Sequence, residues 1–464
     1  MLEAIPFLVV DLALFAFAVR RPWIGLVVVL AGLPVNGFLT QVVPVFLRLT
    51  PEAWITLGGW HDALVGGVVL AGILRWWRAG RPRPSLIEWL VGLMIAVGAV
   101  YVVVSPVPWT ALYVFRVLYE APLLLVAIMV LARLDGMPEW LPSHAARAFV
   151  GAATLSALFT WIQVYVLRFK YIQSFYTDPG QQIHHSFLAT GIRQPRGIGL
   201  SHSPNEFGAI LAIAILLLAA PTLLRLSRAK RAWVFVVLAL AIILSFSRSG
   251  TLSALVGLVV LAWLSRETIG APRNALKSLR NRALLRDVVP AGIAGVLALA
   301  VVVATSGAPT LVKATVSGAE PSAGGRVASA EAGISVLVEH PLGLGLGTAG
   351  PKAARFGLPP DAKRVLTETW YVLYAIQVGV FGFFVLVATA VALLRELIRA
   401  RGMPVCRAAL AIGLGLAAGA VFIPIIEEPS VWTPLWVFAA LAVALATASP
   451  GIAPPDLDRE PSTA

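Results

Sequence analysis

The chain has 464 residues, of which 59% are hydrophobic and only 13% are charged. A soluble domain carries about a quarter charged residues, so a chain this apolar would expose too much hydrophobic surface in water. The composition therefore excludes a soluble globular protein. Its formal net charge of +13 does not indicate nucleic-acid binding, because most lysines and arginines lie in short connectors between apolar segments. The single cysteine, Cys406, excludes an internal disulfide framework.

The apolar residues form uninterrupted segments of transmembrane length and do not alternate as barrel strands would. We therefore predict an all-α fold, a polytopic transmembrane bundle of about 12–13 helices. The first segment runs past Arg20 and Arg21 into the next, so we expect it to be retained in the membrane. The predicted segments are 5–19, 23–47, 54–74, 86–107, 109–132, 147–167, 197–224, 232–246, 250–265, 288–305, 369–394, 406–426 and 431–448.

Strongly basic connectors assign the sides of the membrane, because short cytoplasmic loops carry an excess of lysine and arginine. These connectors are 75–83, 225–231, 266–286 and 395–407. The rule places the long loops 168–196 and 306–368 on the extracytoplasmic side. We predict one transmembrane domain over 1–448, including loop 306–368, followed by a disordered polar tail over 449–464.

The second outer loop has features of an ordered, functional segment. It contains a predicted amphipathic helix over 326–339, followed by a glycine-rich turn that begins at His340. Cations are abundant on this side, where the positive-inside rule predicts few. Such a set indicates an anionic ligand, although contact with lipid headgroups is the alternative for any single residue. The set comprises Arg168, Lys170, Arg193, Arg196, Arg248, Lys313, Arg326, Lys352, Arg355, Lys363 and Arg364.

Two of these arginines lie where apolar segments begin. Arg196 opens a polar stretch, broken by glycine and proline, that runs through His202 to Asn205. Irregular backbone at membrane depth is tolerated only where it lines a cavity or is buried in protein. Arg248 lies at the hinge between two apolar segments, where a tight hairpin with a snorkelling arginine is the alternative.

Two further ionisable groups lie close to or within apolar segments. Arg116 is inside one segment, with Glu120 four residues later. An intramembrane ionisable residue is a functional candidate, but this spacing equally allows a structural ion pair. His61 and Asp62 open another segment, and we interpret them as interfacial.

The remaining sequence contains no recognisable cofactor motif. His184 and His185 have no carboxylate or cysteine at metal-ligand spacing, so we interpret them as a solvated pair. Gly343, Gly345 and Gly347 indicate a flexible turn rather than a nucleotide site. We therefore predict no cofactor and no metal.

Four segments, in this order, resemble the O-antigen ligase and O-antigen polymerase superfamily of bacterial envelope glycosyltransferases. They are RG…HSPN at 196–205, SRSG at 247–250, GR…HPLGLG at 325–345 and ETWY…GVFG at 368–382. The similarity covers roughly 190–385. It implies a metal-independent membrane enzyme that transfers a glycan from a polyprenyl-diphosphate carrier to an acceptor hydroxyl. The resemblance places this reaction at the outer face of the bacterial cytoplasmic membrane.

The resemblance also assigns roles to individual residues. Arg196 and Arg326 match the family's functional arginines best. Glu368 occupies the position where family ligases carry a histidine, so it is either the catalytic base or a helix N-terminal acid capped by Thr367. This departure leaves ligase and polymerase open. The expected substrate-binding residues are Arg248, Asn205, His202, Arg116, His340 and Tyr371.

The expected partners are a polyprenyl-diphosphate-linked glycan donor, a glycan or lipid acceptor and the lipid bilayer, with no nucleic acid. A lipid-linked-oligosaccharide flippase or another transporter is the alternative function, although the two halves show no internal repeat. A non-catalytic envelope scaffold is the third possibility.

Overall fold

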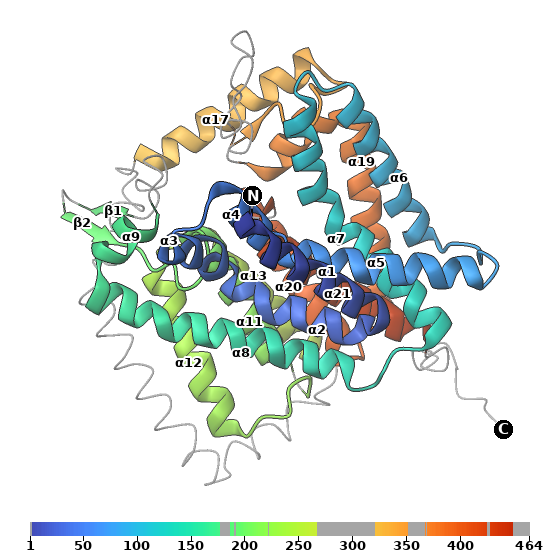
Figure 1. Ribbon diagram of the computed structural model, residues 1–464, viewed down its shortest axis with the longest axis horizontal. Helices are drawn as coiled ribbons and strands as arrows, with labels where there is room; N and C mark the ends of the chain where they lie inside the picture. Colours follow the sequence, from blue (N-terminus) through green and yellow to red (C-terminus); the bar gives the residue numbers. More distant parts are fainter. Residues whose placement is uncertain are drawn as a thin grey trace, which may run out of the picture.

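The computed structural model describes residues 2–176, 186–189, 192–220, 222–266, 321–350, 367, 369–424 and 427–448. Helices dominate these residues, and one two-stranded antiparallel hairpin accompanies them (Figure 1). The predicted all-α bundle is therefore confirmed. The predicted segment 288–305 and the tail 449–464 lie outside the described residues.

The described helices begin and end close to the predicted apolar segments. The first half contains α1 (Ile5–Arg20), α2 (Pro22–Gly32), α3 (Val43–Leu47), α4 (Pro51–Gly58), α5 (Trp60–Arg78), α6 (Leu86–Val103), α7 (Pro108–Asp135), α8 (Leu141–Trp161) and α9 (Phe169–Phe175). After the hairpin of β1 (Ser186–Ala189) and β2 (Ile192–Pro195) come α11 (Pro204–Ala219), α12 (Arg228–Leu244), α13 (Arg248–Arg266), α17 (Pro321–Glu339), α19 (Trp370–Arg399), α20 (Pro404–Ala420) and α21 (Pro429–Ala448).

Six described helices are long and apolar enough to cross a membrane. Two bent helix pairs bring the number of candidate spans to eight if each pair is counted as one span. The bent pairs are 22–47, with an angle of 66°, and 51–78, with an angle of 41°. The first pair breaks at Asn36 and Gly37, and the second breaks at Gly59. The two breaks face each other, because the indole of Trp60 donates a hydrogen bond to the side-chain oxygen of Asn36 at 2.9 Å.

The predicted helix over 326–339 is confirmed as part of α17, which packs against the start of α19 at the edge of the bundle (Figure 1). The chain after α17 then turns back onto a kink in α19 at Gly379, where φ is +68°. The amide of Leu344 donates to the carbonyl of Ile376 at 2.8 Å, and that of Val380 donates to Pro341 at 2.9 Å. The predicted glycine-rich turn is thus hydrogen-bonded to a membrane helix, which the sequence analysis did not foresee.

Candidate functional site

The segment between β2 and α11 is irregular, as predicted from its glycines and its proline. Residues 197–201 are buried in protein and not exposed to lipid, which confirms that expectation. Gly199 adopts a φ of +61°, in the left-handed region that glycine tolerates. This path carries Arg196 and His202 into the bundle.

The side chain of Gln163 satisfies most of this buried backbone. Its Oε1 accepts hydrogen bonds from the amides of Ile198 at 2.9 Å and Gly199 at 3.1 Å. Its Nε2 donates to the carbonyl of Arg196 at 3.1 Å. The hydroxyl of Ser156 accepts from the amide of Leu200 at 2.8 Å. Sequence analysis missed Gln163, although an uncharged polar side chain in the apolar segment 147–167 was a usable signal.

We expect Gln163→Leu to destabilise the protein by at least about 2 kcal/mol, because three buried backbone groups lose their partner. The readout is the thermal midpoint with a thiol-reactive dye, since the only cysteine, Cys406, is buried and reacts on unfolding. Gln173→Leu is the control, because Gln173 is an exposed glutamine of the same region of the protein, on α9. Equal midpoints for the two variants would contradict the assigned role of Gln163.

The guanidinium of Arg196 is fixed across the junction between α12 and α13. Its Nε donates to the carbonyl of Ser245 at 3.0 Å, and one terminal nitrogen donates to the carbonyl of Phe246 at 3.2 Å and to Asn205 Oδ1 at 2.9 Å. These three acceptors are neutral dipoles, and together they fix the orientation of the guanidinium. The structure therefore brings together Arg196 and Asn205, two of the candidate site residues.

Arg248 is the first residue of α13, directly after the junction that Arg196 binds. The hydroxyl of Ser247 accepts from the amide of Gly250 at 3.1 Å and so caps this helix start. A Cβ on Gly250 would lie 2.5 Å from the backbone of Gly208, so α11 and α13 cross in backbone contact here. The predicted position of Arg248 at the hinge between two helices is confirmed. Arg248 lies two residues after Phe246, whose carbonyl binds Arg196.

His202, six residues after Arg196, is partly buried and belongs to a chain of polar contacts. Its Nε2 lies 2.6 Å from the hydroxyl of Thr40, and its Nδ1 lies 3.3 Å from the carboxylate of Glu206. Glu206 is 1% exposed, accepts a hydrogen bond from the amide of His202 at 2.9 Å, and contacts the hydroxyl of Ser430. Elements from the start, middle and end of the chain therefore meet at one histidine.

The other predicted site residues are spread over α17 and α19. Arg326 lies on α17, but the position of its side chain is outside the described part of the chain, as is the whole of Glu368. His340 is exposed at the end of α17. The hydroxyl of Tyr371 donates to the carbonyl of Ala417 at 2.6 Å and joins α19 to α20. The N-cap of α19 is Thr369, so the predicted capping role of Thr367 is wrong.

A second ionic cluster corrects two further interpretations. The carboxylate of Asp62 lies 2.8 Å from Arg116, so the ion pair that we find for Arg116 is not the predicted one with Glu120. Glu120 instead lies 3.9 Å from His61 Nε2. His61 is 4% exposed, so it is not an interfacial residue. His61 lies two residues after the 41° bend between α4 and α5.

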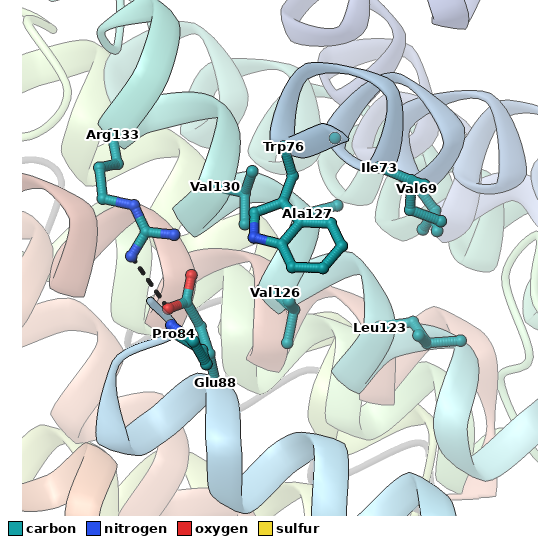
Figure 2. Close-up of a pocket in the computed structure, with 11 residues that line it drawn as sticks. Val69, Ile73, Trp76, Pro84, Glu88, Leu123, Val126, Ala127, Val130 and Arg133 are labelled. Carbon is teal, nitrogen blue, oxygen red and sulfur yellow. Dashed lines mark hydrogen bonds and ion pairs between the residues drawn. The ribbon is translucent and has the colours of Figure 1, made fainter. Parts of the chain in front are cut away.

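A cavity of about 230 Å³ opens between α5, α6 and α7. Figure 2 shows its apolar walls, among them Trp76 and Val126, with Glu88 and Arg133 paired at one edge. The distance between the guanidinium and the carboxylate is 3.0 Å. None of the predicted site residues lines this cavity, so it is separate from the Arg196 region.

The family model described as O-antigen ligase matches residues 233–387, which contain Arg248, α17 and the kink in α19. No curated protein matches the chain.

Proposed function

The match over residues 233–387 supports assigning this multi-pass membrane protein to the O-antigen ligase/polymerase superfamily, and on this premise we propose the following function. The protein is a membrane-embedded glycosyltransferase. It moves a glycan from a polyprenyl-diphosphate carrier to an acceptor hydroxyl of a glycan or lipid, at the outer face of the bacterial cytoplasmic membrane. Ligation and polymerisation share this chemistry, and they differ in the acceptor.

The observation that carries the proposal is the orientation of Arg196. When the glycosidic bond breaks, negative charge develops on the oxygens of the departing diphosphate. A guanidinium held in a partly dry site stabilises this charge without reorganising, and removal of one such donor typically costs about 10²–10³ in rate. Arg196 has three bonds to neutral acceptors that fix it, and Arg248 follows the same junction. The two arginines together would hold the diphosphate.

The acceptor hydroxyl needs a general base. We assign this role to Glu368, because it stands at the family's histidine position and directly precedes the N-cap of α19. We assign Arg326 of α17 to binding of the donor diphosphate, because it matches one of the functional arginines of the family. Asn205, which binds Arg196, and His202, which is held by Thr40, would position the donor.

The proposal is tested with the purified full-length protein in lipid vesicles. A polyprenyl-diphosphate-linked glycan is supplied as the donor, and a glycan and a lipid acceptor are offered in separate reactions. We expect release of polyprenyl diphosphate together with glycosylated acceptor. The acceptor that is consumed distinguishes ligation from polymerisation. Intact donor in both reactions, with correctly folded protein, would reject the proposed activity.

A transporter of lipid-linked oligosaccharides is the second candidate, and the two bent helix pairs favour it, because transporters build their sites from broken helices. The same vesicles distinguish the two functions. A flippase moves labelled donor from one leaflet to the other and leaves the glycosidic bond intact, whereas a transferase consumes the donor.

A further inference from the structure

The second ionic cluster consists of His61, which is buried, and of Asp62 and Glu120, which are partly buried. Glu120 is twelve residues into α7, or about 18 Å from its start at 1.5 Å per residue. The bend between α4 and α5 brings the start of α5 to the same level. Ionisable groups at such depth are costly to bury and therefore need compensation.

The buried atoms of this cluster lack hydrogen-bond partners within the described part of the chain. Neither ring nitrogen of His61 has one, and the same holds for Asp62 Oδ1 and Glu120 Oε1. His61 is also 4% exposed, so water does not replace the missing partners freely. A buried polar atom without a partner destabilises the folded protein, because the bonds to water that it loses are not replaced.

Among the described residues of this cluster, two carboxylates accompany one guanidinium, that of Arg116, which lies 2.8 Å from Asp62 Oδ2. The carboxylate of Asp11 in α1 approaches Gly59, two residues before His61, and adds further negative charge. A cation between the three side chains would satisfy both the charge and the orphaned atoms.

The spacing of the three side chains suits a small divalent ion. Zn²⁺ binds histidine nitrogen and carboxylate oxygen at about 2.0–2.1 Å, so two ligands on a tetrahedron are about 3.3–3.4 Å apart. His61 Nε2 lies 3.4 Å from Asp62 Oδ1 and 3.9 Å from Glu120 Oε2. One ligand atom from each residue can be chosen so that all lie within 4.8 Å of one another.

We propose that His61, Asp62 and Glu120 bind one divalent cation of the Zn²⁺ type, which ties α5 to α7 and leaves one coordination position for water or an anionic oxygen. Arg116 holds the second oxygen of Asp62 and so orients this ligand. The site goes beyond the proposed transferase function and departs from the sequence-based prediction of no metal. Three protein ligands with an open position are the usual donor set of a non-structural zinc site.

The site also neighbours the Arg196 region. The indole of Trp60 binds Asn36, and one helical turn later Thr40 contacts His202. Binding of the cation would therefore stabilise the bent helix pair that supports this histidine.

The test measures the ion itself and needs no substrate. Full-length protein, purified without a polyhistidine tag and stripped with a chelator, is equilibrated with Zn²⁺ and desalted, and bound zinc is measured by mass spectrometry. We expect about one Zn²⁺ per chain, with affinity reduced at least tenfold by His61→Gln or Glu120→Gln. Zn²⁺ should also raise the thermal midpoint of the wild type more than that of either variant.

His144→Gln and Glu88→Gln are the matched controls, because His144 is an exposed histidine and Glu88 a buried glutamate outside the cluster. We expect both to bind zinc as the wild type does. Glu120→Gln preserves the shape of the side chain, so it tests the site even if His61→Gln fails to fold. Equal zinc binding by the wild type and Glu120→Gln, or zinc binding by neither, would overturn the proposal. A proton shared between Asp62 and Glu120 would then explain how the two carboxylates are tolerated side by side. Because binding is measured without glycan, this outcome is independent of the transferase assay.

Discussion

Replacement of Arg196 by alanine should reduce glycan transfer by about 10²–10³-fold while the protein still accumulates in the membrane. The guanidinium is held by two backbone carbonyls and Asn205, so it is oriented before the donor arrives. Its removal takes away positive charge at the point where the departing diphosphate becomes more negative. Arg196→Lys should recover only part of the activity, because an ammonium lacks the planar fork that makes these bonds. The measurement is release of polyprenyl diphosphate from the labelled donor.

The control for Arg196 is another arginine in the same kind of contact. A terminal nitrogen of Arg231 donates to the carbonyl of Leu224 at 2.8 Å, in a connector that we predict to be cytoplasmic. Arg231→Ala should retain full activity. Arg326→Ala should resemble Arg196→Ala if both arginines bind the donor. Normal transfer by both Arg196→Ala and Arg326→Ala would refute the diphosphate-binding role of these arginines.

Much of the site could be inferred from the sequence because it uses rare residues in an apolar chain. Arg196, Asn205 and His202 stand out against their surroundings, and the structure joins Arg196 to Asn205 and His202 to Thr40. The residues that hold this segment in place are harder to recognise from the sequence. Gln163 and Thr40 have nothing in their local sequence that indicates the segment they bind. Such contacts depend on how distant helices pack, and local patterns do not contain that information.

The fold, too, could be predicted from the sequence only in part. Helix positions follow from hydropathy, because the bilayer requires long apolar segments whose backbone bonds are internal. The breaks in the helix pairs 22–47 and 51–78 were not foreseen, since proline and glycine also occur in unbroken membrane helices. These breaks decide which side chains face inward. The His61, Asp62 and Glu120 cluster was missed for this reason, because it requires both a bend and a contact across 58 positions of the sequence.

Gly37→Ala should unfold or strongly destabilise the protein, although alanine is the better helix former. Gly37 has φ −61° and ψ −36°, so alanine meets no backbone strain there and would normally gain about 1 kcal/mol. Its Cβ, however, would lie 2.1 Å from the carbonyl carbon of Ser201 and 2.6 Å from the amide nitrogen of His202. These are backbone atoms, and Gln163 and Tyr176 hold their segment in place. No flexible side chain can therefore move aside to relieve the clash.

Gly92→Ala separates this steric effect from the general effect of alanine. Gly92 lies in α6, and a Cβ there would have no neighbouring atom within 4 Å. We expect Gly92→Ala to keep or slightly raise the thermal midpoint, whereas Gly37→Ala should lower it by an amount equivalent to at least about 1–3 kcal/mol. Any Gly37→Ala protein that does fold should also lose transfer activity, because the displaced segment carries Arg196 and His202. A folded variant with wild-type activity would show that this segment can shift without disturbing the site, and the close contact between Gly37 and Ser201 would then have no part in positioning it.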